Sequence, residues 1–225
     1  MRTVTSPAAG RAALPLLLVS LLASSALPQT ARGRAEELVA QGATQFSHGD
    51  LKGARESYLQ AIGAQPGHFT ALHRLARVES ELSVGESGEE SRGLTASAVE
   101  HAREAVKSQP DSAAGHLELA VALGRQALKE GPKTQLSLSR EIKSEVDRAL
   151  AIDSGLGRGW HVLALWNRKL AGLNLFERAV AKTILGGVPR GASMENAVAD
   201  LKKAIGLEPA YVNHSFQNTT GKAIY

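Results

Sequence analysis

The chain of 225 residues contains no cysteine. This absence excludes a disulfide framework, a thiolate metal site and lipid attachment through cysteine. Aromatic residues are scarce at 4%, whereas apolar residues make up 43% of the chain, so small and aliphatic side chains must supply most of the packing. The formal net charge of +4 becomes +2 when Arg2 and Arg11 are removed with the leader described next. A charge this small gives no electrostatic basis for binding nucleic acid.

Long hydrophobic runs are also rare, and the clearest one, at residues 12–23, follows Arg2 and Arg11. We interpret residues 1–26 as a secretory signal and residues 27–34 as a flexible lead-in. The run has about a dozen residues, whereas a helix that spans a bilayer needs about 20. We therefore expect an exported protein, periplasmic or secreted, with no stable membrane insertion after signal cleavage. An uncleaved anchor is the alternative interpretation.

Small residues, one aromatic residue and a proline recur at fixed positions after residue 34. Counting from Ala35 as position 1, positions 8, 20, 24, 27 and 32 hold Gly42, Ala54, Tyr58, Ala61 and Pro66. Small residues suit two helices that cross closely, an aromatic ring fills the space they leave, and proline ends the second helix. This segment resembles one tetratricopeptide repeat, a unit of about 34 residues that forms two antiparallel helices.

The second half of this motif recurs three times. Its copies are Ala98, Ala102, Ala105 and Pro110; Ile142, Val146, Ala149 and Ser154; and Ala197, Leu201, Ala204 and Pro209. Their spacing exceeds the usual repeat and places insertions at residues 83–93, 127–136 and 174–192, each between the two helices of a pair. We expect a polar mobile loop from the first and a short amphipathic helix from the last.

These patterns predict an all-α fold: a right-handed solenoid of about four tetratricopeptide-type helix pairs over residues 35–212, with insertions between paired helices. Residues 213–225 are expected to form an irregular tail. The segments 138–153 and 159–189 carry a more specific resemblance than the general repeat motif. Together they are similar to the regulator of microtubule dynamics family and its bacterial relatives. The resemblance implies microtubule binding only for eukaryotic members, and a secretory signal argues against that role here.

No residue pattern in the chain indicates catalysis. The seven histidines form no His-Glu-x-x-His motif, and both the phosphate loop and the Gly-x-Ser-x-Gly nucleophile turn are missing. We interpret His116 and His161 as ordinary helix-face residues, and Trp160 and Trp166 as packing residues rather than ligand-stacking ones. We therefore predict a protein that is not an enzyme, with no cofactor and no metal site.

The concave face of such a solenoid is formed by the first helix of each pair, at repeat positions 2, 5, 9, 12 and 13. The basic side chains and histidines at these positions are His73, Arg77, Arg125, Arg158, His161, Arg168 and Lys169. Because arginine pairs well with carboxylates, we predict a partner protein that offers an acidic segment or its C-terminal carboxylate. The alternatives are that these long side chains are merely solvated, that the chain self-associates through its C-terminal end, that it binds microtubules, or that the insertions rim an active site.

Overall fold

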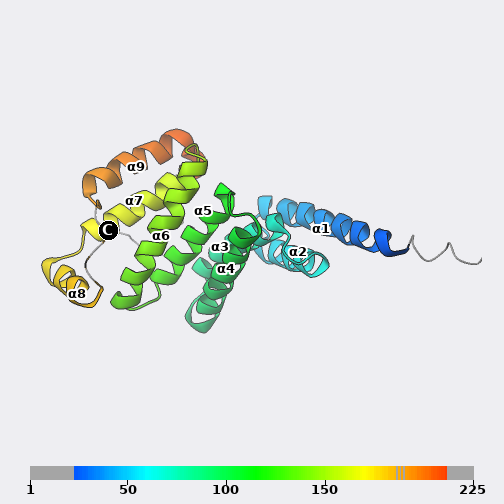
Figure 1. Cartoon of the computed structure of the whole chain (residues 1–225), viewed down its shortest axis with the longest axis horizontal. Helices are drawn as coiled ribbons and strands as arrows, with labels where there is room; N and C mark the ends of the chain where they lie inside the picture. The colour runs from blue at the N-terminus through cyan, green and yellow to red at the C-terminus, as the bar shows by residue number, and fades with distance from the viewer. Residues whose placement is uncertain (1–22, 186, 188, 190, 212–225) are drawn as a thin grey trace, which may run out of the picture.

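The computed structural model describes residues 23–185, 187, 189 and 191–211. These residues form helices and no strand (Figure 1). The helices are α1 (Ala23–Ser47), α2 (Leu51–Ala64), α3 (Phe69–Gly85), α4 (Gly88–Ser108), α5 (Ala113–Ala127), α6 (Pro132–Ile152), α7 (Gly157–Ala171), α8 (Leu175–Leu185) and α9 (Met194–Leu207). None of these described helices combines the length and hydropathy needed to cross a membrane.

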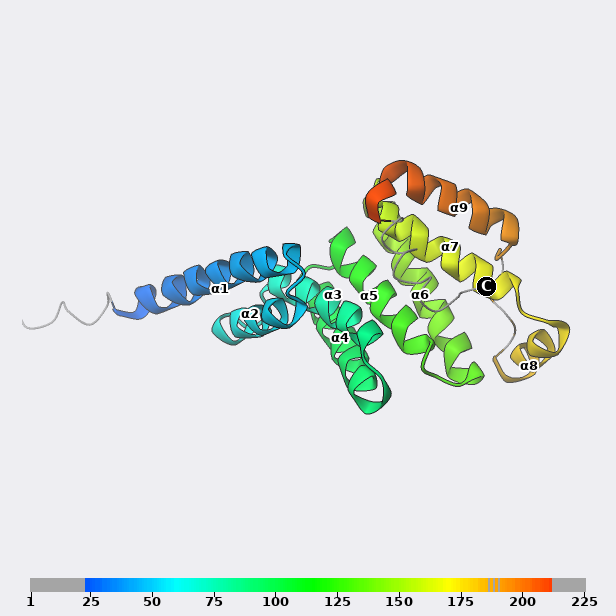
Figure 2. The ribbon, with the colours of Figure 1, turned by 180° about the vertical axis from the view of Figure 1, so that it is seen from behind.

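The helices pack as consecutive pairs: α1 with α2, α3 with α4, α5 with α6, and α7 with α9. The pairs follow one another along the molecule in both views (Figures 1 and 2), from the N-terminal pair to α9 at the opposite end. The first helices also contact each other in sequence, α1 to α3, α3 to α5 and α5 to α7. The predicted fold class, a tetratricopeptide-type solenoid with four helix pairs, is confirmed.

The first helix pair shows why the repeat motif needs its small residues. A Cβ atom placed on Gly42 of α1 would lie 2.6 Å from Cε1 of Tyr58 on α2. Tyr58 is 1% exposed, and Ala54 and Ala61 beside it on α2 are fully buried. The absent side chain at position 42 therefore leaves the space that the aromatic ring fills. Asp50 caps α2 by accepting a hydrogen bond from the Gly53 N–H at 2.8 Å.

The insertion at residues 83–93 does not form the mobile loop that its glycine and serine content predicted. α3 continues to Gly85 and α4 begins at Gly88, so only two residues separate the helices. Ser91 is buried and donates a hydrogen bond to the Ser83 carbonyl at 2.6 Å. Tertiary packing thus overrides the local loop propensity. The second insertion is absorbed only in part: residues 128–131 connect the two helices, and residues 132–136 form the first turns of α6, which has 21 residues.

The third insertion does add a helix, as predicted. α8 begins with a reciprocal cap, in which the Asn174 N–H donates to Glu177 Oε2 at 2.8 Å and the Glu177 N–H donates to Asn174 Oδ1 at 2.9 Å. Arg178 ties the new helix to α7 by donating to the Leu170 carbonyl at 3.0 Å. The helix ends at Leu185, and Gly186 and Val188 of the predicted stop lie outside the described residues.

The predicted boundaries at the two ends are only partly within the described residues. Residues 1–22 of the predicted signal are outside them, and α1 begins at Ala23. Residues 27–34 therefore lie in the first turns of α1, where we expected a flexible lead-in. The predicted tail, residues 213–225, is likewise outside the described part of the chain.

Candidate functional site

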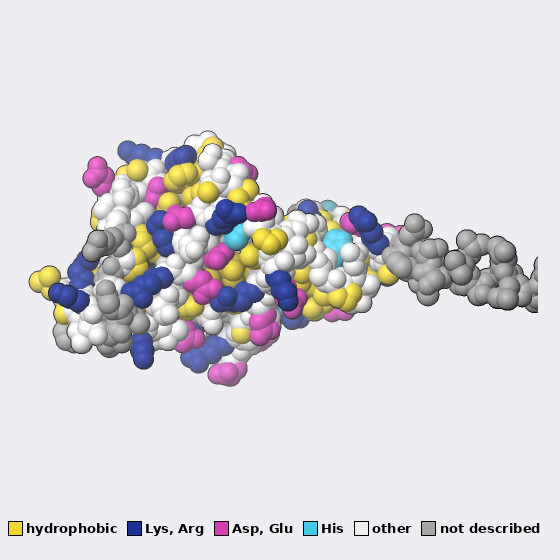
Figure 3. All heavy atoms as spheres, viewed as in Figure 1, with side chains coloured by type: hydrophobic (Ala, Val, Ile, Leu, Met, Phe, Trp, Pro, Cys, Tyr) yellow, Lys and Arg dark blue, Asp and Glu magenta, His cyan; other side chains and the backbone are white. Residues whose placement is uncertain are grey.

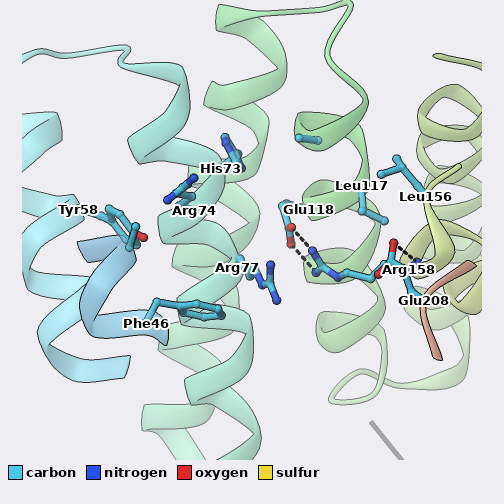
Figure 4. Close-up of a pocket in the computed structure, with 12 residues that line it drawn as sticks. Phe46, Tyr58, His73, Arg74, Arg77, Leu117, Glu118, Leu156, Arg158 and Glu208 are labelled. Atoms are coloured by element: carbon cyan, nitrogen blue, oxygen red, sulfur yellow. Dashed lines mark hydrogen bonds and ion pairs between the residues drawn. The ribbon is translucent and has the colours of Figure 1, made fainter. Parts of the chain in front are cut away.

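A pocket opens on the face formed by the first helices, which we call the concave face. It encloses about 470 Å³ between α1, α3, α5 and α7, and we call it the groove pocket (Figure 4). Its lining residues are Ala43, Phe46, Tyr58, His73, Arg74, Arg77, Ala114, Leu117, Glu118, Leu156, Arg158 and Glu208. Three arginines and two glutamates give the lining a formal charge of +1, on walls that are otherwise largely apolar.

Arg158 and Glu118 form the most buried ion pair in the pocket. Arg158 Nη1 donates to Glu118 Oε1 at 2.6 Å and Nη2 donates to Oε2 at 3.0 Å, which joins α7 to α5. The side chains are only 12% and 4% exposed. Burial alone would lower the pKa of Arg158, but the adjacent Glu118 carboxylate outweighs burial and raises it. The buried Nε of Arg158 has no hydrogen-bond partner among the described residues.

The α3 wall of the pocket carries His73, Arg74 and Arg77. Burial lowers the pKa of His73 to about 4, and the three arginines nearby act in the same direction, against the pull of Glu118. His73 is therefore uncharged near neutral pH. Arg77 lies over the ring of Phe46 from α1, 4.7 Å from its centre, and donates to Glu81 at 3.0 Å.

A second group of cations lies around His161 on α7. Burial lowers the pKa of His161, and the positive charges of Arg125, Arg158 and Arg168 lower it further. We call these three arginines with His161 the arginine cluster. Among the described residues, neither Arg125 nor Arg168 has an acidic partner, whereas Arg158 is held by Glu118. The cluster therefore presents two positive charges that the described part of the chain leaves without a carboxylate.

The segment after α9 also reaches the arginine cluster. The ring of Tyr211 meets His161 edge-on, with ring centres 5.8 Å apart, and lies under Arg158 at 5.4 Å. Glu208, the residue directly after α9, accepts a 3.4 Å hydrogen bond from the backbone N–H of Arg158. An aromatic ring and a carboxylate from this segment thus already contact the N-terminal turn of α7.

The structure brings most of the predicted site residues together, in two groups rather than one. His73, Arg77 and Arg158 line the groove pocket, while Arg125, His161 and Arg168 gather with Arg158 in the arginine cluster. Lys169 is exposed on α7 and belongs to neither group. Whether any of them binds a partner stays a prediction.

Sequence reasoning missed Glu118 and Arg74, which occupy position 6 of the third and second repeats. The positions assigned to the concave face did not include this one. A signal was present in the sequence, because Glu118 is a charged residue within the apolar run Leu117–Ala120. A carboxylate in such a run predicts a buried cationic partner. The groove is consequently less basic than the arginine count suggested. On the face of the molecule drawn in Figure 3, positive and negative side chains likewise lie intermixed.

Two of the residues that could have marked a ligand site, His116 and Trp166, have packing roles in the structure. His116 Nδ1 lies 2.6 Å from Glu145 Oε2, which links α5 to α6. Trp166 is 5% exposed and donates to the Ser139 carbonyl at 2.7 Å. Within the described ranges, no group of three or more histidine, aspartate or glutamate side chains is arranged to hold a metal ion.

Comparison with protein families matches residues 34–217 to a family model described as Regulator of microtubule dynamics protein 1-3. The chain is 30% identical over 181 residues to Regulator of microtubule dynamics protein 3 of Mus musculus, covering 78% of this chain and 38% of that protein. It is 27% identical over 142 residues to Regulator of microtubule dynamics protein 1 of Bos taurus, covering 62% and 44%. The chain thus spans less than half the length of these curated relatives.

Solved structures show the same fold at lower identity. A thermophilic TPR protein from Thermus thermophilus superposes with a TM-score of 0.53 and 17% identity, covering 83% of this chain and 97% of that one. A MamA structure from Desulfovibrio magneticus gives a TM-score of 0.50 and 15% identity, covering 84% and 89%. At these identities the similarity supports the helical-repeat fold and nothing more specific.

Proposed function

The chain belongs to the Regulator of microtubule dynamics protein 1-3 family, and we propose that it acts as a non-catalytic scaffold that binds a partner protein on its concave face. Stacked helix pairs provide an extended concave surface, which is how helical-repeat proteins commonly bind other proteins. The groove pocket and the arginine cluster both lie on that surface, which supports this assignment.

The partner offers an acidic segment or a C-terminal carboxylate to this face. The observation that carries this proposal is the pair Arg125 and Arg168, two cations near a buried histidine without an acidic partner among the described residues. Arginine donates planar pairs of hydrogen bonds that match a carboxylate. Because Arg77 and Arg158 are already held by Glu81 and Glu118, they shape the groove while Arg125 and Arg168 provide the available charge.

We further propose that the protein is exported, to the periplasm or the exterior, on the basis of the basic start and apolar run within residues 1–26. The names of the curated relatives favour a second function, binding to microtubules. The two proposals require different compartments. Fractionation of the native host decides between them: recovery of the mature chain in the cytoplasm would revive microtubule binding, which co-sedimentation with tubulin polymers then tests.

Self-association is a third candidate, favoured by apolar side chains left open on the last helix. Met194, Val198 and Ile205 on α9 are 54%, 50% and 42% exposed, at a spacing that places them along one side of the helix. Light scattering across a range of concentrations tests this candidate. A constant mass would exclude it.

A crosslinked pull-down from the native host tests the proposed function. The bait is the full chain, beside the double variant Arg125→Glu/Arg168→Glu and the control Lys107→Glu/Lys202→Glu. The control replaces exposed lysines on α4 and α9, the second helices of their pairs, and changes the net charge equally. We expect the parent and the control to capture a partner that the arginine variant loses. Capture of the same partner by all three proteins would contradict binding at the arginine cluster.

A further inference from the structure

The groove pocket has a chemical character that the arginine cluster lacks. Phe46 from α1, Leu117 from α5 and Leu156 before α7 give it apolar walls on opposite sides (Figure 4). Its volume of about 470 Å³ lies within the range of roughly 300–1,000 Å³ that is typical of ligand pockets. Such a space fits a large side chain rather than an extended row of carboxylates.

Charged side chains around the pocket are placed to pair with an acidic residue that lies next to this large side chain in a bound segment. Arg74 lines the α3 wall and has no acidic partner among the described residues. Arg158 projects across the pocket toward Glu118, and its buried Nε–H lacks an acceptor among the described residues. That Nε–H is closed off from solvent and its guanidinium is already held by Glu118, so Arg74 is the pocket cation left available to a bound carboxylate.

The same geometry disfavours a segment that is acidic throughout. Glu118 and Glu208 both line the pocket, and Glu118 lies between the α3 and α7 walls. A carboxylate pushed into the pocket would meet these two negative groups, whereas an apolar side chain would meet Phe46 and Leu117. His73 adds no positive charge near neutral pH, because its pKa is lowered to about 4 by burial.

We propose that the groove pocket receives one large apolar side chain of the bound acidic segment, while a carboxylate beside it pairs with Arg74 and the segment's remaining acids meet Arg125 and Arg168. This inference rests on the proposed function and specifies its partner. The recognised feature is an apolar anchor within an acidic stretch, and neither part alone provides full affinity.

Two fluorescein-labelled peptides test the anchor in solution with the purified full chain. The first is Gly-Ser-Asp-Glu-Glu-Trp-Glu-Asp-Ser-Gly, and the second carries serine in place of tryptophan. We expect the tryptophan peptide to bind the parent about tenfold more tightly in fluorescence anisotropy, because an aromatic side chain leaves water. Equal affinity of the two peptides for the parent would overturn the inference and leave the proposed function standing.

A second test blocks the groove pocket with a large side chain of the protein itself. Ala114 lines it on α5, so Ala114→Trp occupies the space without removing an ion pair. The matched control is Ala96→Trp, at an exposed position on α4. We expect Ala114→Trp to erase the preference for the tryptophan peptide while binding the serine peptide like the parent, and Ala96→Trp to retain the preference. A preference that survives in Ala114→Trp, with its circular dichroism unchanged, would overturn the pocket assignment.

A different set of results would contradict the proposed function itself. If neither peptide binds the parent, or if Arg125→Glu/Arg168→Glu binds both as well as the parent does, then acidic-segment recognition on this face is wrong and the anchor inference falls with it.

Discussion

Arg158 on α7 and Glu118 on α5 form a bidentate ion pair, with N–O distances of 2.6 and 3.0 Å and little exposure of either side chain. The pair fixes the third and fourth helix pairs relative to each other at the wall of the groove pocket. It also means that the most buried cation of the predicted site is neutralised within the chain. Partner recognition is therefore assigned to the neighbouring cations, and Arg158 positions the groove.

Removing one member of this pair will destabilise the protein. Glu118→Ala leaves a buried guanidinium without its carboxylate, so we expect the free energy of unfolding to fall by about 3 kcal/mol. In the double variant Glu118→Leu/Arg158→Met both charges are absent, and most of the stability should return. Urea denaturation of the parent and the variants measures this. A double variant less stable than Glu118→Ala would show that the pair itself is strongly stabilising.

Two glycines in the first helix pair differ in the space around them, so replacing each should have the opposite effect on stability. Gly42→Val forces its Cβ toward a buried ring that would lie 2.6 Å away, so we expect a loss of about 2 kcal/mol. Gly63 is exposed on α2 with open space around it, and Gly63→Ala should stabilise by about 0.5–1 kcal/mol. Thermal unfolding of both variants is the measurement. Equal and small effects would contradict the close helix crossing.

His73 makes stability fall in acid. Its folded pKa is lowered to about 4 by burial, below about 6.5 in an unfolded chain, so its contribution is present above pH 6.5 and is lost as the pH falls toward 4. We expect the parent to lose about 2 kcal/mol from this residue over that range, allowing for solvent screening. His73→Gln should lose less stability over the same interval in denaturant titrations. Parallel curves for the parent and the variant would contradict this assignment.

His101 affects the pH dependence of stability in the opposite direction. Its Nδ1 lies 2.7 Å from Oε2 of the fully buried Glu79, which also accepts a hydrogen bond from Arg55. Burial lowers the pKa of His101, but Glu79 outweighs burial and the net shift is upward. The stability it adds is therefore complete below about pH 6.5 and is lost as the pH rises through the raised value.

We accordingly expect His101→Gln to cost more stability at pH 6 than at pH 9. Urea unfolding of the parent and the variant at both pH values measures the difference. A cost that is the same at both pH values would mean that folding does not shift the pKa of His101.

The helix-pair fold could be predicted because its determinants are local. Gly42, Tyr58 and Pro66 occur at fixed spacings within one helix pair, so the repeat motif itself identifies the contact between adjacent helices α1 and α2. The prediction for the first insertion was wrong for the opposite reason. Ser91 is held in α4 by the carbonyl of Ser83 on α3, a contact between two helices that no local propensity encodes.

For the candidate site, the sequence predicted the positions of side chains but not the ion pairs between them. Repeat positions predicted Arg77 and Arg158 on the concave face because those positions follow from the helical period, and both residues line the groove pocket. They did not reveal that Glu118 neutralises Arg158, because the two residues are 40 positions apart in the chain. Positions identify which side chains face the groove, and only the packed structure shows which charges remain available.

The most direct measurement is a calorimetric titration of the full chain with a synthetic glutamate-rich peptide. We expect the parent to bind it, with affinity that weakens as salt is added. Arg125→Glu/Arg168→Glu should bind at least about tenfold more weakly, while Lys107→Glu/Lys202→Glu should match the parent. If the arginine variant and the lysine control weaken binding equally, only net charge matters, and the assignment of the concave face as a specific acidic-segment site is contradicted.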